Sequence, residues 1–248
     1  MPKLTDRTRR RALIATAPML VGLAALAGCG GGDVPASGLP ESRGAAAVQR
    51  QFVDVVDHVS PQVVRIQTSQ GLGSGIVYDD RGDIVTNAHV ADGARRFLVT
   101  LSNGDRHAAT LVGTDPGSDL AVIRVSGGTP APATFGDSSS VRSGDIVFAI
   151  GNPLGLQTSV TQGIVSSLNR NVAEGNGVTL RDAIQTSAEI NPGNSGGALV
   201  NLSGRVIGIP TLAALDPEFG DTQAPGIGFA IPGNTVKQVA SRLIAGGQ

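Results

Sequence analysis

One serine, Ser195, stands between glycines on both sides in the segment NPGNSGGALVN, residues 191–201. A serine in an ordinary helix, strand or surface position needs no neighbours without side chains, so the segment indicates a turn that another group approaches closely. GNSGG also fits the loose pattern G-x-S-x-G, which in α/β hydrolases marks a nucleophilic serine. Those enzymes place the histidine after the serine, and no histidine follows Ser195. The common order that remains is histidine, aspartate, serine.

The chain has three histidines from which such a site could draw its base. His89 stands at the end of the strand-like segment IVTNAHV, where a rigid element can hold an imidazole. His58 lies in an expected helix and His107 in the polar hairpin SNGDRHA, so we predict that these two are surface residues. The candidate base is therefore His89.

The choice of aspartate depends on the residues that come after it in the chain. Asp119 stands directly before the apolar segment LAVIRV, so its carboxylate would lie at the mouth of the core. Asp115 lies in a Pro-Gly turn and is typical of a turn former. We therefore expect Asp119 to complete the set with His89 and Ser195.

The elements that must position these residues are predicted to be strands. The chain of 248 residues has 35 glycines, 16% charged residues and no tryptophan, with many short runs rich in Val and Ile. Six strand candidates fall within about 60–125 and six within about 145–232, and residues 126–144 resemble a linker. This pattern predicts an all-β fold of two six-stranded antiparallel barrels, with short helices near each end. A formal net charge of -1 gives no case for a nucleic-acid partner.

The N-terminal segment is predicted to direct export. Residues 1–28 combine the basic run RTRRR with an apolar stretch, as in a signal peptide. LAGC, residues 26–29, resembles a bacterial lipobox, so Cys29 is the expected lipidation site; an ordinary export signal with a chance cysteine is the alternative. Residues 29–50 are predicted to be a flexible tether, and residues 51–248 the folded domain. A single cysteine excludes an intramolecular disulfide.

Six short sequence motifs resemble those of a known family: TNAHV, SDLAV, AIGNPLGL, TQGIVSSLNR, INPGNSGGALVN and GIGFAIP. Their order and spacing resemble the HtrA (high temperature requirement), or Deg, serine proteases over nearly all of residues 51–240. The resemblance implies a chymotrypsin-like double barrel, with His89 as general base, Asp119 as its orienting acid and Ser195 as nucleophile. It also implies an endopeptidase of unfolded or damaged envelope proteins, with no cofactor and no metal ion.

The turn before the serine is expected to stabilise the oxyanion that forms when a peptide carbonyl is attacked. Backbone N–H groups must point at this oxygen from about 3 Å. We expect Gly193 and Ser195 to supply them, with Asn194 bent between the two.

Further positions are implied by the resemblance alone. Ile190 and the strand that carries Thr211 and Leu212 would line an apolar specificity pocket, and Thr211 would also bond Asp119. Arg170 matches an arginine of the family's regulatory sensor loop. Phe52, which matches an aromatic of the family's trimer contact, carries the expectation of a homotrimer; a solvated arginine and a core phenylalanine are the alternatives.

Three departures leave substrate preference open. Where the family usually reads TDAAINPGNSGG, this chain has Ser187 and Glu189, and the second adds a carboxylate near the pocket. Pro210 stands where a substrate-pairing strand would have an N–H, which proline lacks.

Two other functions are compatible with a protein that binds unfolded chains or has a protease fold. A pseudoprotease or holdase would bind misfolded chains without cutting them, and a secreted trypsin-like digestive enzyme would be expected to show disulfides and an acidic pocket base. The chain ends at RLIAGGQ, where most family members continue into a PDZ domain, so it is either a protease domain alone or truncated. The expected partners are unfolded polypeptides, further copies in a homotrimer and, through a lipid anchor, a membrane of the cell envelope.

Overall fold

The computed structural model of the chain describes residues 43–69, 71–152, 158–173, 179–191, 193–216 and 222–247. Cys29, the predicted signal peptide and residues 29–42 of the predicted tether lie outside the described residues. Within the described part, no helix is both long enough and apolar enough to span a membrane.

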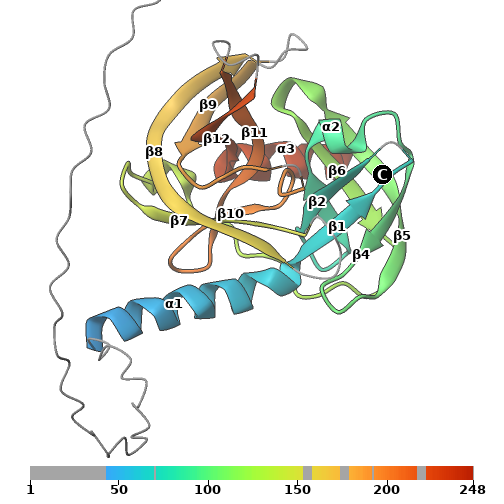
Figure 1. Cartoon of the computed structure of the whole chain (residues 1–248). Coiled ribbons are helices and arrows are strands. Elements are labelled where there is room, and N and C mark those ends of the chain that lie inside the picture. Colours follow the sequence, from blue (N-terminus) through green and yellow to red (C-terminus); the bar gives the residue numbers. More distant parts are fainter. Residues whose placement is uncertain are drawn as a thin grey trace, which may run out of the picture. The chain divides into compact units, whose positions relative to one another are not determined.

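The first half of the folded chain forms a closed antiparallel barrel (Figure 1). Its strands pair in the order β1-β2-β3-β6-β5-β4, which leaves no free edge for pairing with another chain. Their bounds are β1 (Val63–Gln67), β2 (Leu72–Val77), β3 (Asp83–Thr86), β4 (Arg96–Thr100), β5 (Arg106–Asp115) and β6 (Leu120–Val125).

The second half repeats this plan beside the first, in yellow to red in Figure 1. The strands pair in the order β10-β11-β12-β9-β8-β7. Their bounds are β7 (Ile146–Gly151), β8 (Ser159–Ala173), β9 (Thr179–Thr186), β10 (Ala198–Asn201), β11 (Val206–Asp216) and β12 (Thr222–Pro232). The predicted all-β fold of two six-stranded barrels is confirmed.

The alternation of side chains along the strands builds both the barrel interiors and the contact between barrels. Successive residues of a strand face opposite sides. Val64 therefore packs inside the first barrel, while its neighbour Val63 packs outside it, in a cluster shared with Phe148 and Ile150 of β7. This shared apolar cluster fixes the two barrels against each other, so residues at the seam between them are held firmly.

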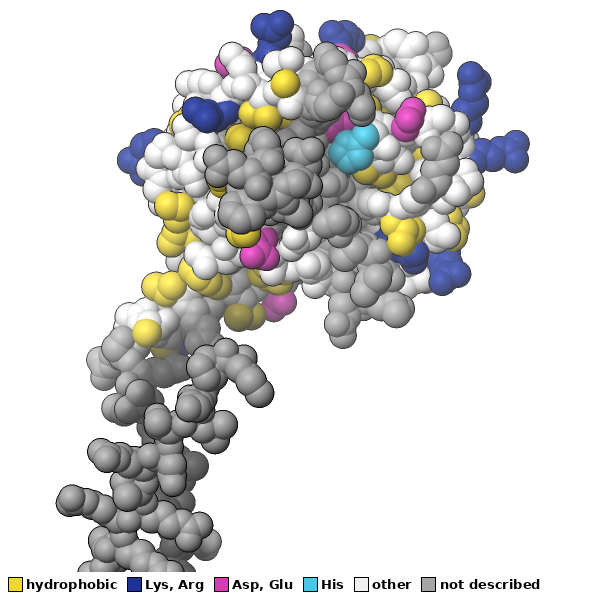
Figure 2. All heavy atoms as spheres, turned by 45° about the horizontal axis from the view of Figure 1, so that its top comes forward, with side chains coloured by type: hydrophobic (Ala, Val, Ile, Leu, Met, Phe, Trp, Pro, Cys, Tyr) yellow, Lys and Arg dark blue, Asp and Glu magenta, His cyan; other side chains and the backbone are white. Residues whose placement is uncertain are grey.

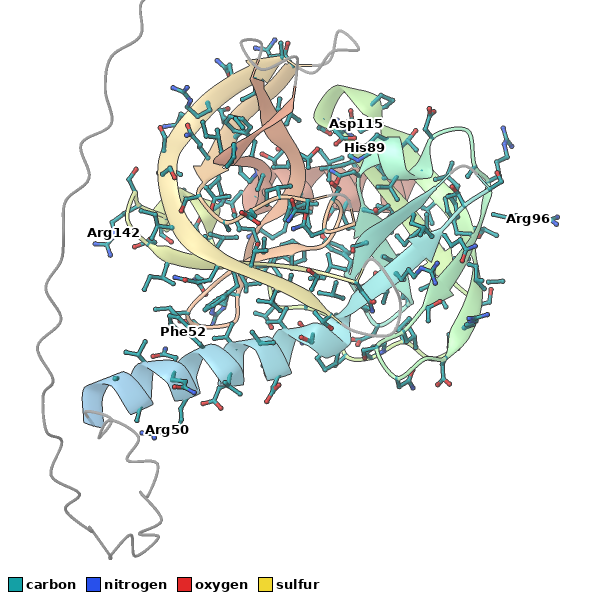
Figure 3. All side chains as sticks on the ribbon, viewed as in Figure 1. Arg50, Phe52, His89, Arg96, Asp115 and Arg142 are labelled. Atoms are coloured by element: carbon teal, nitrogen blue, oxygen red, sulfur yellow. The ribbon has the colours of Figure 1, made fainter. Side chains whose placement is uncertain are left out.

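Three helices accompany the barrels: α1 (Arg43–Val59), α2 (Ala88–Ala91) and α3 (Gly233–Gly246). The helix α1 begins at Arg43, so it includes residues 43–50 of the predicted tether. The segment RGAAAVQR extends the helix toward the N-terminus because its alanines favour helix strongly. The ring of Phe52 packs edge-on against Phe148 of the same chain, with 4.9 Å between ring centroids (Figure 3).

Candidate active site

The imidazole of His89 and the carboxylate of Asp119 form a close pair at the seam between the barrels. His89 Nδ1 lies 2.9 Å from Asp119 Oδ2 and 3.1 Å from Oδ1, and the His89 backbone N–H donates to Oδ1 at 3.0 Å. A carboxylate only accepts, so this geometry assigns the imidazole proton to Nδ1 and leaves the lone pair on Nε2. The ring is thus oriented as a base.

Asp119 is held from several directions. Its carbonyl oxygen accepts from the side-chain amide of Asn87 at 3.0 Å and from the N–H of Ala88 at 3.1 Å, both at the start of α2. The residue is 3% exposed and adopts the left-handed conformation, with φ 50° and ψ 43°. Such strain costs on the order of 1–3 kcal/mol and persists only where the surroundings fix it. The carboxylate therefore has little freedom to turn away from His89.

A β-bulge in β11 brings a third residue to this pair. Pro210 lies opposite Ala230 of β12 and Leu212 opposite Phe229, so Thr211 is the extra residue of the bulge. The bulged Thr211 donates its hydroxyl to Asp119 Oδ2, and its carbonyl accepts the hydroxyl of Ser195 at 3.0 Å.

This geometry contains the expected bond between Thr211 and Asp119, and the contact of Thr211 with substrate stays a prediction. The Thr211 side chain is buried with its hydroxyl turned to the carboxylate. Leu212 continues β11, and its side chain lies outside the described part.

Asn194 closes the turn that carries Ser195. Its N–H donates to the carbonyl of Asn191 at 3.1 Å, its side-chain oxygen accepts from the N–H of Asn191 at 3.1 Å, and its side-chain amide donates to the carbonyl of Glu189 at 3.1 Å. These groups of Asn194 are used within the turn and fix its shape, and its part in an oxyanion hole stays a prediction. Gly193 beside it has φ 108°, a conformation that favours glycine.

The glycine after Ser195 is explained by the backbone of β2. A Cβ on Gly196 would lie 2.3 Å from the carbonyl oxygen of Ser74, and the residue has φ 82°. Its N–H donates to the carbonyl of Pro210 at 2.9 Å. Proline has no N–H, so this carbonyl is the backbone group through which Pro210 supports the turn that carries Ser195. The first barrel thus presses directly on this turn, and a side chain at Gly196 would displace it.

Ser74 is a central residue of the site that the sequence analysis missed. Its N–H donates to the carbonyl of Ser195 at 3.0 Å and its hydroxyl donates to the carbonyl of Gly193, while Oγ accepts the N–H of Asn152 at 2.8 Å. The side chain is fully buried. The available signal was a small polar residue between two glycines inside an otherwise apolar strand, GSGIV.

His89 and Ser195 line one hollow of about 330 Å³ together with Gly193. A second hollow of about 370 Å³ also borders His89 and is bounded by α2, Thr114 and Pro116. The view of Figure 2 shows a histidine side chain open to solvent on this face, with acidic side chains near it. In Figure 3, His89 and Asp115 lie at the same rim of the molecule. The imidazole thus borders two open spaces, as a base that meets a substrate requires.

A third hollow, of about 140 Å³, lies at Ile190, one of the residues predicted to line a specificity pocket. It is lined by Glu189, Ile190, Asn191 and residues 224–227. Ile190 is 4% exposed and belongs to the core of the second barrel, so it forms a rigid apolar wall. Glu189 is exposed at the same hollow, and its backbone carbonyl accepts from Thr161 Oγ1 at 2.7 Å.

The other singled-out residues lie away from this centre. Arg170 is exposed on β8 opposite Ala183, and the ion pairs of the described residues do not include it. Ser187 accepts the N–H of Ile164 at 3.0 Å through its hydroxyl, which ties the strand before the nucleophile turn to β8. The regulatory role of Arg170 stays a prediction.

The chain is similar to known serine proteases along most of its length. Residues 73–209 match the family model of the trypsin-like peptidase domain. The chain is 43% identical over 243 residues to serine protease PepD of Mycobacterium tuberculosis, which covers 90% of this chain and 52% of that protein. It is 48% identical over 184 residues to periplasmic serine endoprotease DegP of Escherichia coli. That match covers 73% of this chain and 38% of DegP. The chain thus spans about half or less of these relatives.

Solved structures agree with this relationship. The HtrA-type protease AlgW with a tripeptide has a TM-score of 0.71 and 39% identity, covering 79% of this chain and 64% of that one. The same protease with a decapeptide has a TM-score of 0.69 and 33% identity. With the two barrels, the family match and these relatives together, the chain belongs to the trypsin-like peptidase family and carries a serine protease domain of the HtrA/Deg type.

Proposed function

We propose that this chain is a serine endopeptidase that cuts peptide bonds with Ser195 as nucleophile, His89 as general base and Asp119 as the orienting acid. The observation that carries the proposal is that His89, paired with Asp119 through Nδ1, borders the same hollow as Ser195. The trypsin-like family match and relatives named serine proteases support the same reaction.

The reaction can be derived from the geometry in two halves. Ser195 Oγ attacks the carbonyl carbon of the peptide while His89 Nε2 takes the hydroxyl proton, and the Asp119 carboxylate stabilises the imidazolium. The hydroxyl bonds the Thr211 carbonyl at rest, so it exchanges that bond for His89 when it reacts. The imidazolium then gives its proton to the leaving amine, and water repeats the sequence on the acyl-enzyme. The N–H groups of Gly193 and Ser195 are the proposed donors to the oxyanion.

Unfolded polypeptides of the cell envelope are the proposed substrates. The small hollow at Ile190 has an apolar wall, which suits aliphatic side chains and discriminates by only about 1–3 kcal/mol per methylene. Selection then depends on whether a protein can offer an extended backbone to the site. A relative named for the periplasm and HtrA-type structures with bound peptides support export and polypeptide substrates. Lipidation at Cys29 and assembly into a homotrimer are further parts of the proposal.

Digestion of one model protein in two states tests this function. We expect the full chain to cut a reduced, denatured protein after Val, Ala, Ile or Leu and to leave the native form nearly intact. The Ser195→Ala variant serves as control and should cut neither. Cleavage sites are mapped by mass spectrometry, and predominant cutting after Lys or Arg would show that Glu189, not Ile190, decides what the pocket takes.

The same experiment separates the protease from a holdase. A holdase would keep the denatured protein soluble and uncut, with equal effect from the wild type and from Ser195→Ala. The intact set of His89, Asp119 and Ser195 favours cutting.

A further inference from the structure

We propose that the hollow beside Ser195 binds a Lys or Arg side chain of the substrate residue that directly follows the scissile bond, with Asp92 as its carboxylate partner. This inference rests on the proposed endopeptidase function. It assigns a charge preference to the leaving-group half of the substrate, which the hollow at Ile190 does not contact.

The position of the hollow identifies the half of the substrate that it receives. Of the hollows described, it contacts both Ser195 and His89, and it shares no residue with the hollow at Ile190. The acyl half stays on Ser195 after attack, with its side chain near Ile190. The leaving amine must receive its proton from His89, so the leaving half crosses the hollow that borders both catalytic groups.

The wall of this hollow offers apolar surface for a side-chain stem. Leu72, at the start of β2, is 49% exposed and is one of the large hydrophobic residues that the described surface leaves open. Val90 packs against the same strand, since a Cβ on Gly73 would lie 2.6 Å from Val90 Cγ1. Leu72 and Val90 both line the hollow beside Ser195, and together they are its apolar strip.

Asp92 places a single carboxylate at the rim of that strip. It follows α2 directly, three residues after His89, and its side chain is exposed. None of the ion pairs found among the described residues involves Asp92. Arg95 lines the second hollow at His89, which Asp92 also borders, but it does not line the hollow beside Ser195. The carboxylate is thus open to a cation supplied by the substrate.

The combination fits the build of Lys and Arg better than that of other side chains. Both residues carry an apolar stem and a charged head, so the stem can cover Leu72 and Val90 while the head reaches Asp92. A leucine would use the strip and leave the carboxylate unused. An acidic residue would place like charges together, which lowers its binding. The volume of about 330 Å³ lies within the range of ~300–1,000 Å³ for ligand clefts, so a long side chain can enter.

Internally quenched peptides test the assignment. The peptides share one sequence with valine before the scissile bond and differ only in the next residue, which is Arg, Lys, Leu or Glu. For the full chain we expect kcat/KM to be higher for Arg than for Glu by about two- to thirty-fold, because attraction to Arg and repulsion of Glu each contribute the range of one exposed charge pair. The ratio should shrink in 1 M salt, because salt screens exposed charges.

Two variants assign the effect to one carboxylate. Asp92→Asn should bring the Arg to Glu ratio close to one and leave kcat/KM for the Leu peptide unchanged. Asp80→Asn removes the same charge from an exposed position beyond the other end of β2 and should leave the ratio intact. A wild-type ratio near one, or a ratio that Asp92→Asn does not reduce, overturns the inference while the endopeptidase stands. If the wild type cuts none of the peptides and no denatured protein, the proposed function itself is wrong.

Discussion

Replacing Ser74 with alanine should separate the support of the oxyanion turn from ordinary stability. The substitution removes Oγ, so the carbonyl of Gly193 loses its donor and the N–H of Asn152 loses its acceptor. The carbonyl and the N–H both bond to the fully buried hydroxyl of Ser74. Each buried polar group that loses its hydrogen bond costs about 1–3 kcal/mol of stability. The sum of about 2–6 kcal/mol is an upper bound, because relaxation of the turn or an entering water can satisfy one of them.

The same relaxation should lower the rate of the chemical step. Once its carbonyl is released, Gly193 can rotate, and its N–H no longer has a fixed direction toward the oxyanion. Loss of one such donor costs about 10²–10³ in kcat, so we expect Ser74→Ala to lower kcat by roughly ten- to a hundred-fold as the turn keeps part of its geometry. KM should change little, since the hollows that hold the substrate keep their walls.

Steady-state peptide hydrolysis and thermal unfolding of the same preparations measure the two effects. Ile76→Val, on the same strand and fully buried, is the control because it should cost about 0.5–1.5 kcal/mol of stability without touching the turn. If Ser74→Ala keeps the kcat of Ile76→Val at temperatures where both are folded, Ser74 stabilises the fold only and the reasoning is refuted.

Three further substitutions test Thr211 at the site and two acidic residues that support the fold elsewhere. Thr211→Val removes the hydroxyl that bonds Asp119 Oδ2 and should lower kcat several-fold with KM unchanged; an unchanged kcat in the same peptide assay would contradict the support role. Asp83→Asn removes the charge and one acceptor from the two-bond pair with Arg124 that joins β3 to β6, at 2.7 and 2.9 Å, and should cost about 1.5–3 kcal/mol in denaturant unfolding while activity per folded molecule stays. Bonds from the side chains of Asn234 and Ser139 hold the pKa of Asp137 at about 2, below its ordinary 3.8. Because the folded pKa is depressed, this stabilisation is present above 3.8 and is lost as the pH falls toward 2. The Tm of Asp137→Asn should therefore lie below that of the wild type at neutral pH, and the difference should narrow in that window; a constant difference would contradict it.

The barrels were predictable because their signal is local. Successive residues of a strand face opposite sides, as Val63 and Val64 do, so the spacing of apolar residues predicts which side chains are buried. The turns between the strands are rich in Gly, Asp and Asn. The limits of elements were less predictable where polar residues continue a strand. β8 runs to Ala173, because its polar segment after Leu168 still pairs with β9 across irregular register shifts.

The residues that shape the site without reacting were harder to find, since their roles depend on contacts between distant parts of the chain. Ser74 and Gly193 are 119 positions apart, and no pattern within β2 shows that its serine will meet that carbonyl. The bulge at Thr211 depends on the register of β11 against β12, which the sequence of β11 alone does not contain. His89, Asp119 and Ser195 could be predicted because chemistry restricts their types and their order.

The central claim, that Ser195 is a nucleophile activated by His89, is tested most directly by labelling with a fluorophosphonate probe. The folded wild type should take up one probe molecule, and mass spectrometry of the digest should place it on Ser195. Under identical conditions Ser195→Ala should remain unlabelled, and His89→Ala should label more slowly by several orders of magnitude. A folded wild type that does not react, or labelling that persists in Ser195→Ala, would contradict the claim.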